Sequence, residues 1–289
     1  MKPPPFSYHD PRSIEDAVAL LSRHENAKVL AGGQSLMPML NMRYVLPDHL
    51  IDLNRIDGLS YIREDGDALE IGAMTRQRDL EFSDVVSRRC PLMHEALLQV
   101  GHRQTRNRGT IGGSLSHLDP AAELPAVCMA TDATVRVQGP NGKREIAFAD
   151  FPAAYMTPAI EMDEIVTSIR VPLWPRGHGH AFVEFSRRHG DFAVASAAAL
   201  LTVGSDGKIA RASLTVGGVA LAPLRMTAIE EALVGGDGSE DRFRDLCEAC
   251  REIEAMGDVY ASTEYRQHLA TVMSRRALVK AYGRASGTA

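Results

Sequence analysis

The chain has 289 residues, of which 45% are hydrophobic and 24% charged, and its formal net charge is −5 at pH 7. These values are typical of a soluble globular protein with one large domain or two, and the dispersed charge argues against nucleic acid or anionic lipid as a partner. The longest nearly apolar run, at 192–203, is too short to span a bilayer. The N-terminal MKPPPFSYHD lacks the apolar core of a signal peptide, so we expect a cytoplasmic protein.

The first part of the chain predicts a β-α-β start. Ser13 is a suitable N-cap, and apolar residues recur at helical spacing after it, so we expect a helix over 13–23. Short strands should follow at 28–31, ending in a glycine pair, and at 50–53. The elements expected next are a hairpin over 60–73 with an Asp-Gly turn, a helix over 91–100, a hairpin over 132–148 with an Asn-Gly turn, and a strand over 164–173.

The segment WPRGHGH at 174–180 is rich in Pro, Gly and His and predicts a domain boundary. We therefore expect one domain over 1–176, with lobes at about 1–56 and 57–176, and a smaller one over 177–289. The second domain should contain three strands, at 180–188, 192–204 and 209–220, and then helices at 224–234, 239–256 and 263–282.

Two segments share one pattern, in which a glycine pair lies between an apolar stretch and small polar residues. They are VLAGGQSLMPML at 29–40 and RNRGTIGGSLSHLDP at 106–120. A glycine pair after a strand removes Cβ atoms, so that the freed amides can converge on an anion, and nearby hydroxyls can add donors. Two such loops are suited to the two phosphates of one dinucleotide, although neither is a Walker A or G-x-G-x-x-G sequence. The alternative is a tight turn between core elements at each place.

The motifs AGGQSL and RNRGTIGGSLSHLDPAAELP resemble those of the FAD-binding medium subunits of the molybdenum hydroxylases. This family includes the carbon monoxide dehydrogenase medium subunits and the equivalent flavin domain of xanthine dehydrogenase. The resemblance extends from FSYHDPRSIEDAVALL through RRHGDFAVAS and covers nearly the whole chain. It implies an α+β fold, with a two-lobed FAD-binding domain of the vanillyl-alcohol-oxidase (PCMH) type followed by a smaller α+β domain with a three-stranded antiparallel sheet and helices.

The resemblance also implies that both glycine loops hold the pyrophosphate of one FAD. The residues implied to form this cradle are Ala31, Gly32, Gly33, Gln34, Ser35 and Leu36 in the first loop, and Thr110, Ile111, Gly112, Gly113 and Ser114 in the second. Arg106 and Arg108 flank the second loop, where they would balance phosphate charge or pair with carboxylates instead.

Further FAD contacts follow from the same resemblance. Asp119 and Glu123 are implied partners of the ribityl and adenosine portions. The alternatives are a helix cap at Asp119 and a solvent-facing position for Glu123. Apolar walling is implied for Val100, Ile165 and Val166, and Phe192 is implied to cover one face of the isoalloxazine ring. For these four residues the alternative is an ordinary place in the core.

The function implied is electron transfer through FAD inside a larger molybdenum enzyme. A large partner subunit would carry the molybdenum cofactor, and a small one would carry two [2Fe-2S] clusters, in a dimer of heterotrimers. The FAD of this chain would pass the electrons to an external acceptor, so this chain needs no catalytic acid or base. Cys247-x-x-Cys250 and His178-x-His180 lack further ligands at suitable spacing, and we expect no metal site. The alternatives are a stand-alone FAD-dependent oxidoreductase and a non-catalytic nucleotide-binding module.

Overall fold

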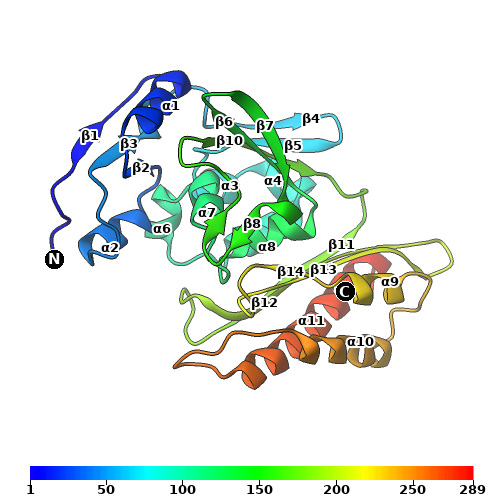
Figure 1. Ribbon diagram of the computed structural model, residues 1–289. Helices are drawn as coiled ribbons and strands as arrows, with labels where there is room; N and C mark the ends of the chain where they lie inside the picture. The colour runs from blue at the N-terminus through cyan, green and yellow to red at the C-terminus, as the bar shows by residue number, and fades with distance from the viewer. Residues whose placement is uncertain (289) are drawn as a thin grey trace.

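The structure is a computed structural model, and it describes residues 1–288. Its main sheets have three, five and four strands and follow one another along the chain, and a two-stranded ribbon lies beside the second (Figure 1). The α+β expectation is confirmed. Among the described residues, no helix is both long and apolar enough to cross a membrane.

The first lobe is a small parallel sheet with two helices. Its elements are β1 (Ser7–His9), α1 (Ile14–Arg23), β2 (Ala27–Leu30), α2 (Leu36–Asn41) and β3 (His49–Asp52), and its strand order is β1-β3-β2. The hydroxyl of Ser13 accepts a hydrogen bond from the amide of Asp16 at 3.1 Å, so α1 begins where the sequence predicts. The β-α-β start is confirmed, with β1 and α2 as additional elements.

The second lobe is a five-stranded antiparallel sheet with helices packed against one face. Its strands are β4 (Ile62–Asp65), β5 (Ala68–Gly72), β6 (Thr134–Gly139), β7 (Gly142–Ala147) and β10 (Ile165–Pro172), in the order β4-β5-β10-β6-β7. Between β5 and β6 come α3 (Gln77–Glu81), α4 (Asp84–Arg89), α5 (Pro91–Leu97), α6 (Arg103–Arg108), α7 (Ile111–His117) and α8 (Glu123–Ala130). The ribbon is β8 (Pro152–Ala154) with β9 (Thr157–Pro158), and single 3-10 turns lie at Leu53–Arg55 and Phe148–Asp150.

Both hairpins predicted for this lobe are present, but the second turns one residue earlier than expected. Gly139 pairs with Gly142, so the turn residues are Pro140 and Asn141 rather than Asn141 and Gly142. Gly142 has a φ of +109°, which explains why a glycine follows the turn.

The C-terminal part has four antiparallel strands, not the three that the sequence predicts. They are β11 (Gly179–Ser186), β12 (Ala193–Val203), β13 (Ile209–Gly217) and β14 (Leu224–Arg225). The pairing of β14 with β13 uses the residues expected to begin a helix, so α9 (Thr227–Leu233) starts later. Two residues are too few to show strand alternation in a sequence, which is why β14 was missed.

Two further helices complete this part. The helix expected over 239–256 is α10 (Glu240–Cys247), which tightens into a 3-10 turn at Glu248–Glu252, and the last helix is α11 (Thr263–Ser286). One face of the sheet packs against α9, α10 and α11. The other face of the sheet is turned toward the second lobe (Figure 1). Phe182, Ala198 and Leu200 on this face belong to the same core as the second lobe. The C-terminal sheet therefore shares an apolar interface with the second lobe.

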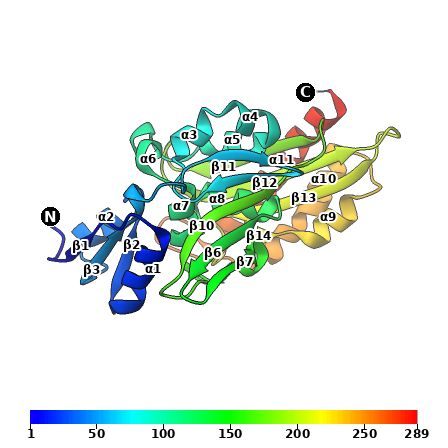
Figure 2. The same cartoon turned by 90° about the horizontal axis from the view of Figure 1, so that it is seen from above.

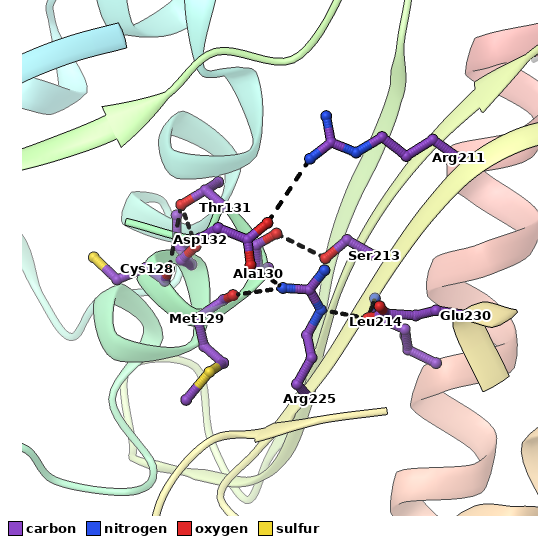
Figure 3. Close-up of polar contacts among 11 residues, drawn as sticks. Cys128, Met129, Ala130, Thr131, Asp132, Arg211, Ser213, Leu214, Arg225 and Glu230 are labelled. Carbon is purple, nitrogen blue, oxygen red and sulfur yellow. Dashed lines mark hydrogen bonds and ion pairs between the residues drawn. The ribbon is translucent and has the colours of Figure 1, made fainter. Parts of the chain in front are cut away.

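Polar contacts reinforce this interface where α8 ends beside β13 and β14 (Figure 3). Arg225 donates to the carbonyl of Met129 at 3.1 Å and to the carboxylate of Asp132 at 2.6 Å. The hydroxyl of Ser213 donates to the carbonyl of Ala130 at 2.7 Å. Because these contacts satisfy carbonyls at the end of α8, they fix the position of that helix relative to the C-terminal sheet.

Candidate cofactor site

A cleft of about 720 Å³ opens between the first lobe, the helices α7 and α8, and the start of β10. Its volume is within the range usual for sites that bind cofactors and other small molecules. Every residue that the sequence analysis assigned to FAD lines this cleft, except Ile111. The fold thus brings together side chains and loops that are as far apart in the sequence as Ala31 and Phe192.

The first glycine loop, residues 31–35, connects β2 to α2 and forms part of the wall. Gly33 has a φ of +74°, a left-handed conformation that favours glycine. Within residues 1–288, the backbone amides of Gly32, Gly33, Gln34 and Ser35 donate no hydrogen bond. Four consecutive free amides at a cleft wall are donors suited to an anion.

The second glycine pair differs from the prediction, because it lies in the first turn of α7. The amide of Gly112 donates to the carbonyl of Ala73 at 2.9 Å, and the amide of Gly113 donates to the hydroxyl of Thr110 at 3.1 Å. The amides on either side of the pair are bonded within the protein as well. The expectation that both pairs free their amides is therefore wrong for this loop. The groups that it can still offer to a ligand are the hydroxyls of Thr110 and Ser114.

The two glycine loops pack directly against each other. A Cβ atom on Gly32 would lie 2.2 Å from the carbonyl oxygen of Arg108, and one on Gly113 would lie 3.5 Å from the Cβ of Ala31. A Cβ on Gly112 would lie 2.6 Å from that of Ala73. Close packing therefore explains Gly32 and Gly112, as the tight-turn alternative had it, and this packing sets both loops at one wall of the cleft.

Two carboxylates line the cleft near the start of α8. Asp119 accepts a hydrogen bond from the amide of Ala121 at 2.9 Å, so it closes the turn before the helix rather than capping the helix itself. Glu123 is only 7% exposed, which rules out the solvent-facing alternative. Burial, with a smaller contribution from Asp119, raises the pKa of Glu123 to about 7. Near neutral pH its carboxyl can therefore donate as well as accept a hydrogen bond.

The apolar side chains of the predicted set occupy different environments. Val100, Ile165 and Val166 are buried and belong to the core while also lining the cleft. Phe192 is 67% exposed and lies just before β12, so the alternative of a strand-core position is wrong. Ile111 is fully buried in the core and does not reach the cleft.

Of the two arginines that flank the second loop, Arg106 forms side-chain contacts within the protein. Arg106 is buried and donates to Glu81 at 2.8 Å and to the carbonyl of Val100 at 2.7 Å, so the carboxylate-pairing alternative describes it. Arg76, which the sequence analysis missed, donates to the carbonyl of Arg108. His117 also lines the cleft, and its pKa is lowered by burial. His117 lies inside the second glycine motif, but the sequence analysis assigned it no role in binding.

Two family models match this chain and together cover most of it. Residues 4–174 match the FAD binding domain in molybdopterin dehydrogenase, and residues 180–281 match the CO dehydrogenase flavoprotein C-terminal domain. The chain belongs to the FAD-binding medium subunits of the molybdenum hydroxylases. Members of this family are subunits of molybdenum-containing dehydrogenases, and the α+β fold described above is theirs.

Individual members are similar over their full length. The chain is 41% identical over 288 residues to the carbon monoxide dehydrogenase medium chain of Afipia carboxidovorans, covering 99% of each. It is 40% identical over 290 residues to the 6-hydroxypseudooxynicotine dehydrogenase complex subunit alpha of Paenarthrobacter nicotinovorans, covering 100% of this chain and 98% of that protein. A solved chain of carbon monoxide dehydrogenase from Hydrogenophaga pseudoflava superposes with a TM-score of 0.95 at 38% identity, over 98% of this chain and 99% of that one.

Proposed function

We propose that the chain binds FAD in the cleft, with the pyrophosphate at the first glycine loop. The observation that carries this proposal is the run of free amides from Gly32 to Ser35. An FAD pyrophosphate is an anion without donors of its own, and converging amides are a common way to hold such a group. The hydroxyls of Ser35, Thr110 and Ser114 lie on the same cleft and add donors.

The remaining cleft residues fit the other parts of FAD. Asp119 and Glu123 are suited to the hydroxyls of the ribityl and adenosine portions, since a carboxylate accepts and a protonated carboxyl also donates. Val100, Ile165 and Val166 provide an apolar wall that excludes water. Phe192, exposed at the edge of the cleft, can fold over the isoalloxazine ring. Bound FAD supplies the electron-transfer chemistry, and these residues position the cofactor and control its surroundings.

We infer that the chain acts as the electron-transferring subunit of a heteromeric molybdenum hydroxylase. Its partners in this proposal are a large subunit with the molybdenum cofactor and a small subunit with two [2Fe-2S] clusters, in a dimer of heterotrimers. Electrons would reach the FAD from the [2Fe-2S] clusters and leave to an external acceptor. The full-length similarity to subunits of a carbon monoxide dehydrogenase and of a 6-hydroxypseudooxynicotine dehydrogenase complex supports this role. The large subunit would then determine the substrate.

We propose two domains that follow each other along the chain. Residues 1–176 form the FAD-binding domain, two-lobed in the manner of vanillyl-alcohol oxidase, and residues 177–289 form the C-terminal domain. The match boundaries at 174 and 180 support a border in the Pro- and Gly-rich segment.

The test is affinity purification of the tagged chain from its native cells, followed by metal analysis and activity assays. We expect co-purification with molybdenum-containing and iron–sulfur subunits, and a flavin spectrum. The isolated chain loaded with FAD should oxidise no heterocycle or aldehyde. Turnover by the isolated chain at the rate of the complex would favour the stand-alone oxidoreductase. A folded chain without affinity for FAD would favour the nucleotide-binding module.

A further inference from the structure

Three histidines from different elements of the first lobe lie close together. His9 ends β1, His24 directly follows α1, and His49 begins β3. One candidate ligand atom from each ring lies within 4.8 Å of the other two. Nε2 of His9 and Nδ1 of His49 are 3.0 Å apart, and the ring centroids of His24 and His49 are 4.0 Å apart. In the part of the chain that the structure describes, this is the one group of three histidine, cysteine or carboxylate side chains so close together.

The cluster is separate from the cofactor cleft. None of the three histidines lines the cleft, and the first lobe forms one end of the molecule, away from the C-terminal sheet (Figure 2). The cluster is also not explained by ion pairing. The carboxylate of Asp10 pairs with Arg55, and that of Asp48 accepts from Asn26. Within residues 1–288, no carboxylate hydrogen-bonds to the three rings.

The three rings are partly shielded from water. All three side chains are half-buried, so the first lobe would partly enclose an ion bound between them. A neutral imidazole is a ligand that suits zinc, copper and nickel.

We propose that His9, His24 and His49 bind one divalent late transition metal ion, Zn²⁺ above all, with solvent at the remaining position. In a tetrahedral zinc site with Zn–N bonds of about 2.0–2.1 Å, the nitrogens are about 3.4 Å apart. The nitrogens of His9 and His49 are already near that spacing, and the His24 ring has to turn toward them. The hydrogen bond between His9 and His49 breaks on binding, and the ring that donated it carries its proton on its other nitrogen instead, by exchange with solvent, so that all three ligands stay neutral imidazoles.

A bound metal ion is expected to stabilise the first lobe by connecting three of its elements. β1 is a three-residue strand at the sheet edge and is joined to the rest of the sheet only through β3. The ion would connect the end of β1 and the end of α1 to the start of β3. Because the same lobe carries the first glycine loop, the metal would stabilise the part of the protein that holds the free amides.

The test is calorimetric titration of the chelator-treated full-length chain with ZnCl₂, without FAD because its phosphates also bind metals. The variants are His24→Ala and His49→Gln, and the control is His268→Ala, an exposed residue of α11. The parent and the control should bind one equivalent and gain several degrees in melting temperature. Both cluster variants should lose that equivalent and that shift, and Co²⁺ should give a tetrahedral visible spectrum only in the parent and the control.

The proposal is overturned by either of two results. One is that a cluster variant, folded by circular dichroism, binds Zn²⁺ with the stoichiometry and affinity of the parent. The other is that the parent binds no more Zn²⁺ than the folded variants. If one variant fails to fold, the other decides the outcome.

Discussion

Replacing Glu123 by glutamine should stabilise the protein at alkaline pH and have little effect near pH 5. The carboxyl is 7% exposed, and burial is the main reason that its pKa is raised from 4.5 to about 7. Well below pH 4.5 the carboxyl is protonated in the folded and the unfolded chain, so burying it costs no free energy of ionisation there. Between pH 4.5 and 7 the unfolded chain loses the proton while the folded chain keeps it, so stability falls as the pH rises.

The size of the effect follows from the shift. Each pKa unit corresponds to about 1.36 kcal/mol, so the penalty amounts to about 0.8 kcal/mol at pH 5 and about 3.3 kcal/mol at pH 8. Glutamine carries no charge at either pH. We therefore expect the difference in unfolding free energy between Glu123→Gln and the parent to grow by about 2.5 kcal/mol in favour of the variant from pH 5 to pH 8.

The measurement is urea denaturation of the FAD-free chain at both pH values. Glu231→Gln is the matched control, because Glu231 is exposed on α9 and its replacement should leave the unfolding free energy nearly unchanged at either pH. A Glu123→Gln variant whose advantage over the parent is the same at pH 5 and pH 8 would refute the reasoning. The carboxylate would then be ionised in the folded chain at low pH, as at a hydrated surface.

Three further changes test other parts of the structure. Glu184→Gln should behave like Glu123→Gln over a window that extends to about pH 8, because burial and then Glu123 raise its pKa to about 8; the same urea series checks this. Arg225→Ala should lower the unfolding free energy by about 3 kcal/mol, because it leaves the buried carboxylate of Glu230 without its charged partner at the interface of Figure 3. Arg244→Ala on the surface should cost less than about 1 kcal/mol, and chemical denaturation measures both. Gly32→Ala should lower the unfolding free energy by about 1–3 kcal/mol, because its Cβ would lie 2.2 Å from the carbonyl oxygen of Arg108 and push the two glycine loops apart. It should also weaken FAD binding in a fluorescence titration. Unchanged stability and affinity would contradict the loop packing.

Local signals in the sequence predicted those elements that local interactions determine. Ser13 fixes the start of α1 through a contact three residues away, and the Asp-Gly turn of the first hairpin needs only its own strands. By contrast, β14 exists because it pairs with β13, and its two residues carry no pattern of their own. The sequence analysis therefore missed β14 because this strand depends on tertiary pairing and not on a local pattern.

The site shows the same division. Nearly all of the residues that the family motifs assigned to FAD line the cleft, because each motif is a continuous segment. They could not show that the second glycine pair starts a helix, where Thr110 caps Gly113 and the amides are used internally. They also gave no sign of the cluster of His9, His24 and His49, which are brought together only by the folding of the first lobe.

The most direct test of the central claim is amide hydrogen exchange of the chain with and without FAD, resolved for both glycine loops. The amides of Gly32 to Ser35 have no acceptor in the described protein, so they should exchange fast without FAD and slowly once FAD is bound. The amides of Gly112 and Gly113 are already bonded, so their exchange should be slow and change much less. Saturating FAD that leaves the exchange of Gly32 to Ser35 unchanged would contradict the proposed cradle.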